Sequence, residues 1–121
     1  MSLEVACGIM YNKDNKILLA LRKDNECWEF PGGKLEKNET IEECLQREWS
    51  EELNLEIIIK HELCQYMSNN YLCRFFIGQI IDETKIKKNV HENIIFLDKQ
   101  EIFNMKLFKD DYQLKKYLVN S

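Results

Sequence analysis

The sequence predicts one α/β domain over residues 1–121, with a mostly antiparallel or mixed sheet. Several β-rich apolar runs lie on both sides of a single strongly signalled amphipathic helix. A length of 121 residues with 45% hydrophobic residues suffices for one buried core. No internal repeat or linker divides the chain, so all of these runs are expected to join one fold.

The first two apolar runs predict a β-hairpin. Residues 3–12 and 16–22 read as strands, and the turn between them is Asn12-Lys13-Asp14-Asn15. A loop follows and ends in Trp28-Glu29-Phe30-Pro31-Gly32-Gly33-Lys34. Proline ends any strand there, and paired glycines allow other groups to approach the backbone closely.

The strongest signal is a helix that begins after Thr40. Thr40 and Glu43 form the pattern of a capping box, in which each side chain bonds the other residue's backbone N–H. The helical pattern continues to Leu53. Asn54 then stands where a left-handed residue ends a helix, a place that asparagine tolerates second only to glycine.

The second half of the chain predicts another hairpin followed by short elements. Its two long strands cover residues 55–67 and 71–81 and turn near Ser68-Asn69-Asn70. The remaining predicted elements are a short strand at 94–97, a weak helix at 99–104 and an amphipathic helix at about 110–119.

Composition excludes several classes of protein. A net charge of −4, from 17 basic and 21 acidic residues, argues against a protein that coats nucleic acid or binds anionic membranes. Five irregularly spaced cysteines and two distant histidines argue against a disulfide framework and a zinc site. The sequence shows no signal peptide and no membrane span. We therefore expect a cytoplasmic protein with reduced thiols.

Two acidic residues of the predicted helix fall on its apolar face. At 3.6 residues per turn, Glu48 and Glu52 fall in the middle of the apolar arc, and Glu51 falls at its edge. The apolar residues of this arc are Ile41, Cys44, Leu45, Trp49 and Leu53. A Glu-rich helix can present a solvated acidic face, but such glutamates should lie opposite the apolar residues, as Glu43 does.

Desolvated, clustered carboxylates need a proton or a cation. Oxygen donors alone suit a hard divalent ion, Mg²⁺ or Mn²⁺, rather than zinc. Since Mg²⁺ commonly joins a few carboxylates to the phosphates of a substrate, the helix predicts a polyphosphate ligand for this acidic chain.

The helix and its surroundings carry a longer pattern. Gly33 is followed after five residues by Glu39 and after seven more by Arg47-Glu48-Trp49-Ser50-Glu51-Glu52-Leu53-Asn54-Leu55. This spacing resembles the signature of the Nudix hydrolases, with Asn54 in place of the last glycine. The preceding Trp28-to-Lys34 run is most similar to the MutT-type subgroup. The resemblance implies an α/β/α sandwich with a mixed, largely antiparallel sheet.

The resemblance also implies an activity. MutT-type enzymes use Mg²⁺, or Mn²⁺ as a substitute, to cleave a nucleoside triphosphate to a monophosphate and pyrophosphate. An oxidised purine nucleotide such as 8-oxo-dGTP is the first expected substrate. CTP, dCTP or another nucleoside-diphosphate-linked compound is the alternative, and an inactive nucleotide-binding module is a further one. A monomer or homodimer is expected, with no membrane or nucleic-acid polymer as partner.

Residue roles follow from the same resemblance. Glu48, Glu51 and Glu52 are the expected metal ligands, together with the backbone carbonyl near Gly32. Arg47 is expected to orient the neighbouring carboxylates, although an ordinary surface ion pair would also explain it.

Two further acidic residues have open roles. Glu39 supports catalysis or stabilises the start of the helix. The general base is a motif glutamate or a residue of the loop before the last strand, which holds His91 and Glu92. Relatives often carry Glu-His in that loop, and Val90 stands in place of the Glu, which weakens the case for Glu92.

Four residues are expected to contact substrate. Arg22 and Lys34 match positions that meet phosphates, Arg as a two-pronged donor and Lys as a point charge. Phe30 walls the base pocket or belongs to the core. Asp111, in the pair Asp110-Asp111, reads the edge of the base or caps the C-terminal helix.

Overall fold

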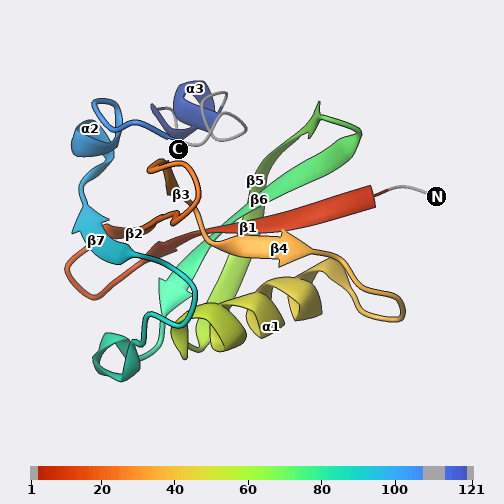
Figure 1. Cartoon of the computed structure of the whole chain (residues 1–121), viewed down its shortest axis with the longest axis horizontal. Helices are drawn as coiled ribbons and strands as arrows, with labels where there is room; N and C mark the ends of the chain where they lie inside the picture. Colours follow the sequence, from red (N-terminus) through yellow and green to blue (C-terminus); the bar gives the residue numbers. More distant parts are fainter. Residues whose placement is uncertain (1–2, 108–113, 120–121) are drawn as a thin grey trace.

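The computed structural model of the chain describes residues 3–107 and 114–119 (Figure 1). Its strands are β1 (Leu3–Tyr11), β2 (Ile17–Leu21), β3 (Trp28–Glu29), β4 (Gly32–Lys34), β5 (Ile57–Ser68), β6 (Tyr71–Ile80) and β7 (Asn93–Leu97). Its α-helices are α1 (Ile41–Leu53), α2 (Lys99–Ile102) and α3 (Lys115–Val119), and a 3₁₀ turn covers Glu83–Lys85.

The strands form one mixed sheet. Along its main path the order is β3-β2-β1-β6-β5, while β4 also pairs with β1 and β7 with β2. β1 and β6 run parallel, and the other pairs are antiparallel. The predicted mixed, largely antiparallel sheet is confirmed.

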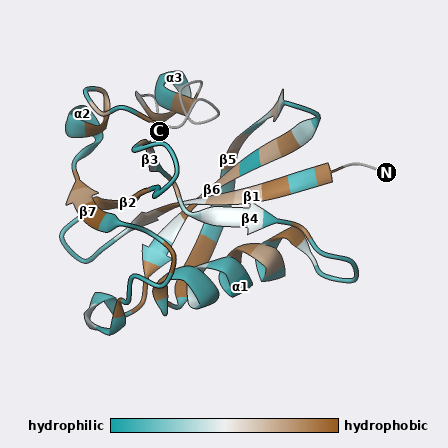
Figure 2. Ribbon diagram, viewed as in Figure 1, coloured by the Kyte–Doolittle hydropathy of each residue, from teal (hydrophilic) through white to brown (hydrophobic). Residues whose placement is uncertain are grey.

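The helices lie on both faces of the sheet (Figure 1), as the predicted sandwich requires. α1 covers one face, and its buried residues pack with Ala6, Leu18 and Phe76. On the other face, Ile102 of α2 and Leu118 of α3 join a second core. Figure 2 shows apolar residues along the strands, while the visible side of α1 is largely hydrophilic. Among the described residues, no helix has the length and apolar character needed to cross a membrane.

Both predicted hairpins are present. β1 and β2 pair across the Asn12–Asn15 turn, where the Asn12 side chain accepts bonds from the N–H groups of Asp14 and Lys16. β5 and β6 pair up to Ser68 and Tyr71. Asn69 and Asn70 between them have φ values of 48° and 70°, which is the left-handed geometry of a two-residue hairpin turn.

The run from Trp28 to Lys34 was predicted as the end of a loop, but it contains two short strands, β3 and β4. Pro31 does end a strand, but short strands lie on both sides of it, and β4 pairs with β1. Gly32 makes this pairing possible: an added Cβ would lie 1.8 Å from the carbonyl oxygen of Ala6. None of the chain's glycines has a positive φ, so Gly32 supplies space rather than an unusual backbone conformation.

One short helix is shorter than its pattern predicts, because α2 ends at Ile102 instead of Asn104. α3 (Lys115–Val119) lies within the helix predicted at about 110–119, and residues 110–113 of that prediction lie outside the described residues. The 3₁₀ turn after β6 was not predicted, because a three-residue element has no periodic pattern to detect.

One carbonyl joins the sheet, the loop and α1. The oxygen of Pro31 accepts a 2.8 Å bond from the indole N–H of Trp49 and a 2.9 Å bond from the backbone N–H of Gly8. Trp49 is fully buried, and a Cβ at Gly8 would lie only 2.7 Å from its Nε1. The middle of the loop is thereby fixed against both β1 and α1.

Trp49→Phe is expected to lower the free energy of unfolding by about 1–3 kcal/mol, because it removes a buried hydrogen bond and leaves a small void. Urea unfolding followed by circular dichroism measures the change. Trp28→Phe is the matched control, since Trp28 is only half-buried. Equal losses in the two variants would contradict a special role for the Trp49 indole.

Candidate active site

α1 presents its glutamates as the helical pattern predicts. Its buried residues are those of the predicted apolar arc. The side chains of Glu48 and Glu52 are only 16% and 14% exposed, whereas that of Glu51 is 60% exposed. Two carboxylates are thus drawn into the packed face of the helix, and the third stands at its rim.

Glu52 lies in the least favourable setting for a charge. Burial raises its pKa to about 9, and the hydrogen bond and charge of Glu48 and the charges of Glu29 and Glu51 act in the same direction. A carboxyl group so placed holds a proton or requires a cation. This electrostatic setting agrees with a cation site on this face.

Gly33 makes room for Glu48. A Cβ built on Gly33 would lie 2.3 Å from Cδ of Glu48 and 2.6 Å from both of its carboxylate oxygens. The backbone of β4 therefore lies directly against this carboxylate. Glycine at position 33 is required here by steric contact with a side chain of α1.

Arg47 binds the acidic residues on both sides of the helix start. Its guanidinium makes a two-pronged contact with Glu39, at 2.9 and 3.1 Å, and a 2.8 Å bond with Glu48. A weaker contact at 3.4 Å reaches Glu51. Arg47 also donates to the carbonyl of Lys34, so it connects β4 to α1 and fixes the orientation of Glu48.

Glu39 is a bridging residue. Besides Arg47, its carboxylate accepts a 2.8 Å bond from the backbone N–H of Glu36. Chiefly the hydrogen bond from Arg47, and then that from Glu36, lowers the pKa of Glu39 to about 2. These contacts stabilise the loop before α1, which is the structural one of the two roles considered for Glu39.

The end of α1 is tied to the connection between β6 and β7. Asn54 has the predicted left-handed conformation, with φ 57° and ψ 36°, and its side chain donates to the carbonyl of Lys85. Asn89 donates through its side chain to the carbonyl of Glu51 and through its backbone to that of Glu52. These bonds satisfy carbonyls that a helix end leaves open. They also bring the following residues beside Glu52.

That connection places His91 in the site. The side chain of His91 is 3% exposed, and its Nε2 lies 2.7 Å from Oε2 of Glu29 and 3.8 Å from Oε1 of Glu52. One donor atom from each residue can be chosen so that all three lie within 4.8 Å of one another. Sequence reasoning did not single out Glu29, and it named His91 only as a member of the loop that could supply the general base. Only the position of Glu29 inside the Trp28-to-Lys34 run could have marked it.

Two adjoining hollows open beside these side chains. One, of about 320 Å³, is mostly apolar and is lined by Val5, Cys7, Phe30, Tyr71, Cys73 and Phe75 together with Arg22, Glu29 and Lys34. The other, of about 330 Å³, is polar and includes Arg22, Glu29, Glu52 and His91. Arg22, Glu29 and Gly32 line both hollows, so an elongated ligand could occupy the two together.

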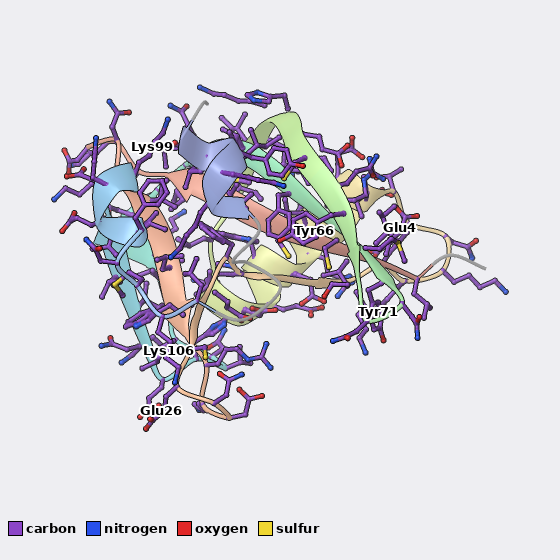
Figure 3. The ribbon with its side chains drawn as sticks, turned by 90° about the horizontal axis from the view of Figure 1, so that it is seen from above. Glu4, Glu26, Tyr66, Tyr71, Lys99 and Lys106 are labelled. Carbon is purple, nitrogen blue, oxygen red and sulfur yellow. The ribbon has the colours of Figure 1, made fainter. Side chains whose placement is uncertain are left out.

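The predicted substrate-binding residues lie around the apolar hollow. Arg22 is bound to Asp24 and Glu29, each through close contacts of 2.8 to 2.9 Å. Lys34 places its Nζ 5.0 Å from the ring centre of Tyr71, which Figure 3 shows at the turn end of the β5–β6 hairpin. Phe30 both lines the hollow and packs edge-on against Phe75, so it meets both descriptions considered for it.

The remaining predicted site residues are Glu92 and Asp111. Glu92 is exposed, and its backbone N–H donates to the carbonyl of Leu21, whereas His91 beside it faces Glu29 and Glu52. Asp111 lies outside the described residues.

Comparison with known proteins agrees with this arrangement. A sequence profile of the NUDIX domain matches residues 1–117. The chain belongs to the NUDIX domain family. A Nudix relative, the 8-oxo-dGTP diphosphatase of Proteus vulgaris, is 42% identical over 59 residues, which cover 46% of this chain and 53% of that protein. The ADP-ribose pyrophosphatase of Methanocaldococcus jannaschii is 45% identical over 67 residues, covering 53% and 40%.

The Nudix fold is matched over nearly the whole chain. The solution structure of the E. coli ORF135 protein superposes with a TM-score of 0.81 at 25% identity, covering 98% of this chain and 89% of that one. By contrast, the sequence matches to the two curated relatives span only about half of each relative's length, 53% and 40%. The family assignment confirms the resemblance predicted from Gly33, Glu39 and the motif on α1.

The site's donors fit the divalent ion that Nudix hydrolases generally use. Glu48 and Glu52 are desolvated carboxylates held side by side, and β4 packs against one of them. Glu48 is paired with the guanidinium of Arg47, while the acidic side chains of Glu48, Glu29 and Glu51 act unfavourably on the charged form of Glu52. A bound divalent cation would relieve this repulsion.

Proposed function

We propose that this chain is a Mg²⁺-dependent pyrophosphohydrolase that cleaves a nucleoside triphosphate to a nucleoside monophosphate and pyrophosphate. The observation that carries the proposal is the junction of two hollows, one apolar and one lined by Glu52 and Arg22. A nucleobase suits the first and a phosphate chain with its metal ion suits the second.

Glu48, Glu51 and Glu52 are proposed as the ligands of Mg²⁺, or of Mn²⁺ in its place, with the carbonyl of Gly32 as a further donor. When bound, the metal neutralises phosphate oxygens and activates water for attack at phosphorus. Arg47 holds Glu48 in position, and Glu39 in turn holds Arg47. Both act on the site through orientation.

A motif glutamate is the proposed proton acceptor. The motif glutamates stand on α1 beside the polar hollow, which Glu52 lines. Glu92, the alternative considered from the sequence, is exposed, and its backbone pairs with β2. The geometry therefore favours a residue on α1.

The proposed substrate is a purine nucleoside triphosphate of the 8-oxo-dGTP kind, with CTP or dCTP as the alternative. The aromatic and aliphatic lining from Phe30, Phe75 and Val5 suits the flat face of a base. Arg22 lines both hollows and Lys34 lines the apolar one, and both are proposed to contact the phosphates. The named relatives, a diphosphatase and a pyrophosphatase, share the phosphate chemistry but differ in substrate.

The deciding experiment is a substrate panel with product analysis. Nucleoside triphosphates, oxidised purine triphosphates and ADP-ribose are incubated with the protein and Mg²⁺, with a chelator as the matched control. We expect monophosphate plus pyrophosphate from one triphosphate class. Release of orthophosphate would overturn the proposal, and binding without turnover of any compound would leave a nucleotide-binding module instead.

The predicted cytoplasmic location and the monomer or homodimer state stay predictions.

A further inference from the structure

Three donor atoms from distant segments converge beside α1. They belong to Glu29 at the end of β3, Glu52 near the end of α1, and His91 just before β7. The Nε2 atom of His91 is 2.7 Å from Glu29 and 3.8 Å from Glu52. In a metal complex with bonds near 2.1 Å, two donors at a right angle lie about 3 Å apart. These three side chains therefore need only small rotations to share one ion.

The imidazole is unusually placed for a merely structural histidine. Its side chain is 3% exposed, and its Nδ1 atom has no hydrogen-bond partner in the part of the chain that the structure describes. Nε2 is directed at the carboxylates of Glu29 and Glu52. A metal ion at this position would be bound by the Nε2 lone pair of the tautomer that carries its hydrogen on Nδ1.

The carboxylates of Glu29 and Glu52 each place one oxygen near Nε2 of His91. Arg22 occupies Oε1 of Glu29, which leaves Oε2 directed at His91. The side chain of Glu52 is 14% exposed, and its Oε1 lies 3.8 Å from the same nitrogen. Arg22 on Glu29 and Arg47 on Glu48 oppose a cation, but their two positive charges face three carboxylates, those of Glu29, Glu48 and Glu52. The polar hollow lined by these residues gives the ion access from solvent.

We propose that Glu29, Glu52 and His91 form a second metal site, specific for a divalent transition ion such as Mn²⁺, Fe²⁺ or Co²⁺. Imidazole nitrogen favours the transition series, whereas Mg²⁺ prefers oxygen donors and retains its waters. The site shares Glu52 with the ligand set of the proposed function and in that respect rests on it. Its own ligands, Glu29 and His91, lie outside that set.

In this proposal, His91 determines which metal ion the second site binds most tightly. With Mg²⁺ alone, the α1 carboxylates are the available donors. With a transition ion present, the nitrogen of His91 adds a ligand that Mg²⁺ does not use well. The protein should then bind Co²⁺ or Mn²⁺ more tightly than Mg²⁺.

The chain offers a well-matched control, because it has two histidines and the other, His61, is exposed on β5 at the far edge of the sheet. Untagged wild type, His91→Gln and His61→Gln are titrated with Co²⁺ and separately with Mg²⁺ by calorimetry. His91→Gln should weaken Co²⁺ binding by about 10- to 100-fold, and Mg²⁺ binding by less than about 3-fold. His61→Gln should match wild type. Unchanged Co²⁺ affinity in folded His91→Gln would overturn the second site.

A spectroscopic measurement keeps the test valid if His91→Gln fails to fold. His61→Gln retains only one imidazole, that of His91. Pulsed electron paramagnetic resonance of bound Mn²⁺ in this variant should show nitrogen coupling from a coordinated ring. Absence of that coupling overturns the proposal.

The two proposals fail in different ways. Mg²⁺-dependent pyrophosphate release without nitrogen coupling to Mn²⁺ would remove the second site and keep the proposed function. Nitrogen coupling without turnover of any nucleotide would remove the proposed function and keep the second site. Neither readout depends on the other, because the metal titrations and spectra require no substrate.

Discussion

Glu52→Gln is expected to lower metal-dependent hydrolysis by about 100-fold or more, because it removes a carboxylate that we propose as a ligand of the metal ion. The variant should fold at least as stably as wild type without metal. Burial and three nearby carboxylates destabilise the charged form of Glu52, and glutamine carries no charge. Initial rates of pyrophosphate release and thermal melts by circular dichroism measure the two effects.

Glu42→Gln is the matched control for this substitution, since Glu42 is exposed in the first turn of the same helix. It should retain nearly full activity. Millimolar Mg²⁺ should raise the melting temperature of wild type and of Glu42→Gln, because a ligand of the native state stabilises it. Glu52→Gln should lose most of that increase. If Glu52→Gln hydrolysed substrate at the wild-type rate, the proposed role of α1 would be wrong.

Gly33→Ala is expected to lower hydrolysis by about 100-fold, the order of loss that follows a displacement of about 1 Å in an active site. The added methyl would lie 2.3 Å from Cδ of Glu48, so the carboxylate must leave its position. Arg47 and the β4 backbone would follow it only in part, because Arg47 is also held by Glu39. Steady-state rates with the best substrate of the panel measure the loss.

A double-mutant cycle tests whether this loss acts through Glu48. Glu48→Gln alone and Gly33→Ala with Glu48→Gln are assayed beside the single Gly33→Ala variant. If alanine acts by displacing the carboxylate, the double variant should be little worse than Glu48→Gln. Fully additive losses would show that Gly33→Ala disturbs something else, such as the pairing of β4 with β1.

Local patterns predicted the parts of the fold that local chemistry determines. The capping box at Thr40 and Glu43 and the left-handed Asn54 define α1, and both are present. The two glutamates within its apolar arc already indicated a desolvated acidic site, and the structure finds them largely buried. The two hairpins likewise follow from short turns rich in asparagine.

The remaining parts depend on contacts between distant segments. β4 is three residues long and exists because glycines let it lie against β1 on one side and Glu48 on the other. The proximity of Glu29 to His91 joins residues 62 positions apart, and no periodicity in the sequence records it. It results from sheet order and from the bonds of Asn89 to the end of α1.

The shared carbonyl of Pro31 has a consequence for how the site can change. The height of α1 above the sheet is set by the indole of Trp49 resting against Gly8, in a contact that excludes water. A Cβ at Gly8 would meet the Trp49 indole, so any side chain there would lift the helix and its glutamates together. Substitutions in the solvent-facing loops can therefore alter which ligand enters the hollows, while contacts in the core fix the spacing of the acidic groups.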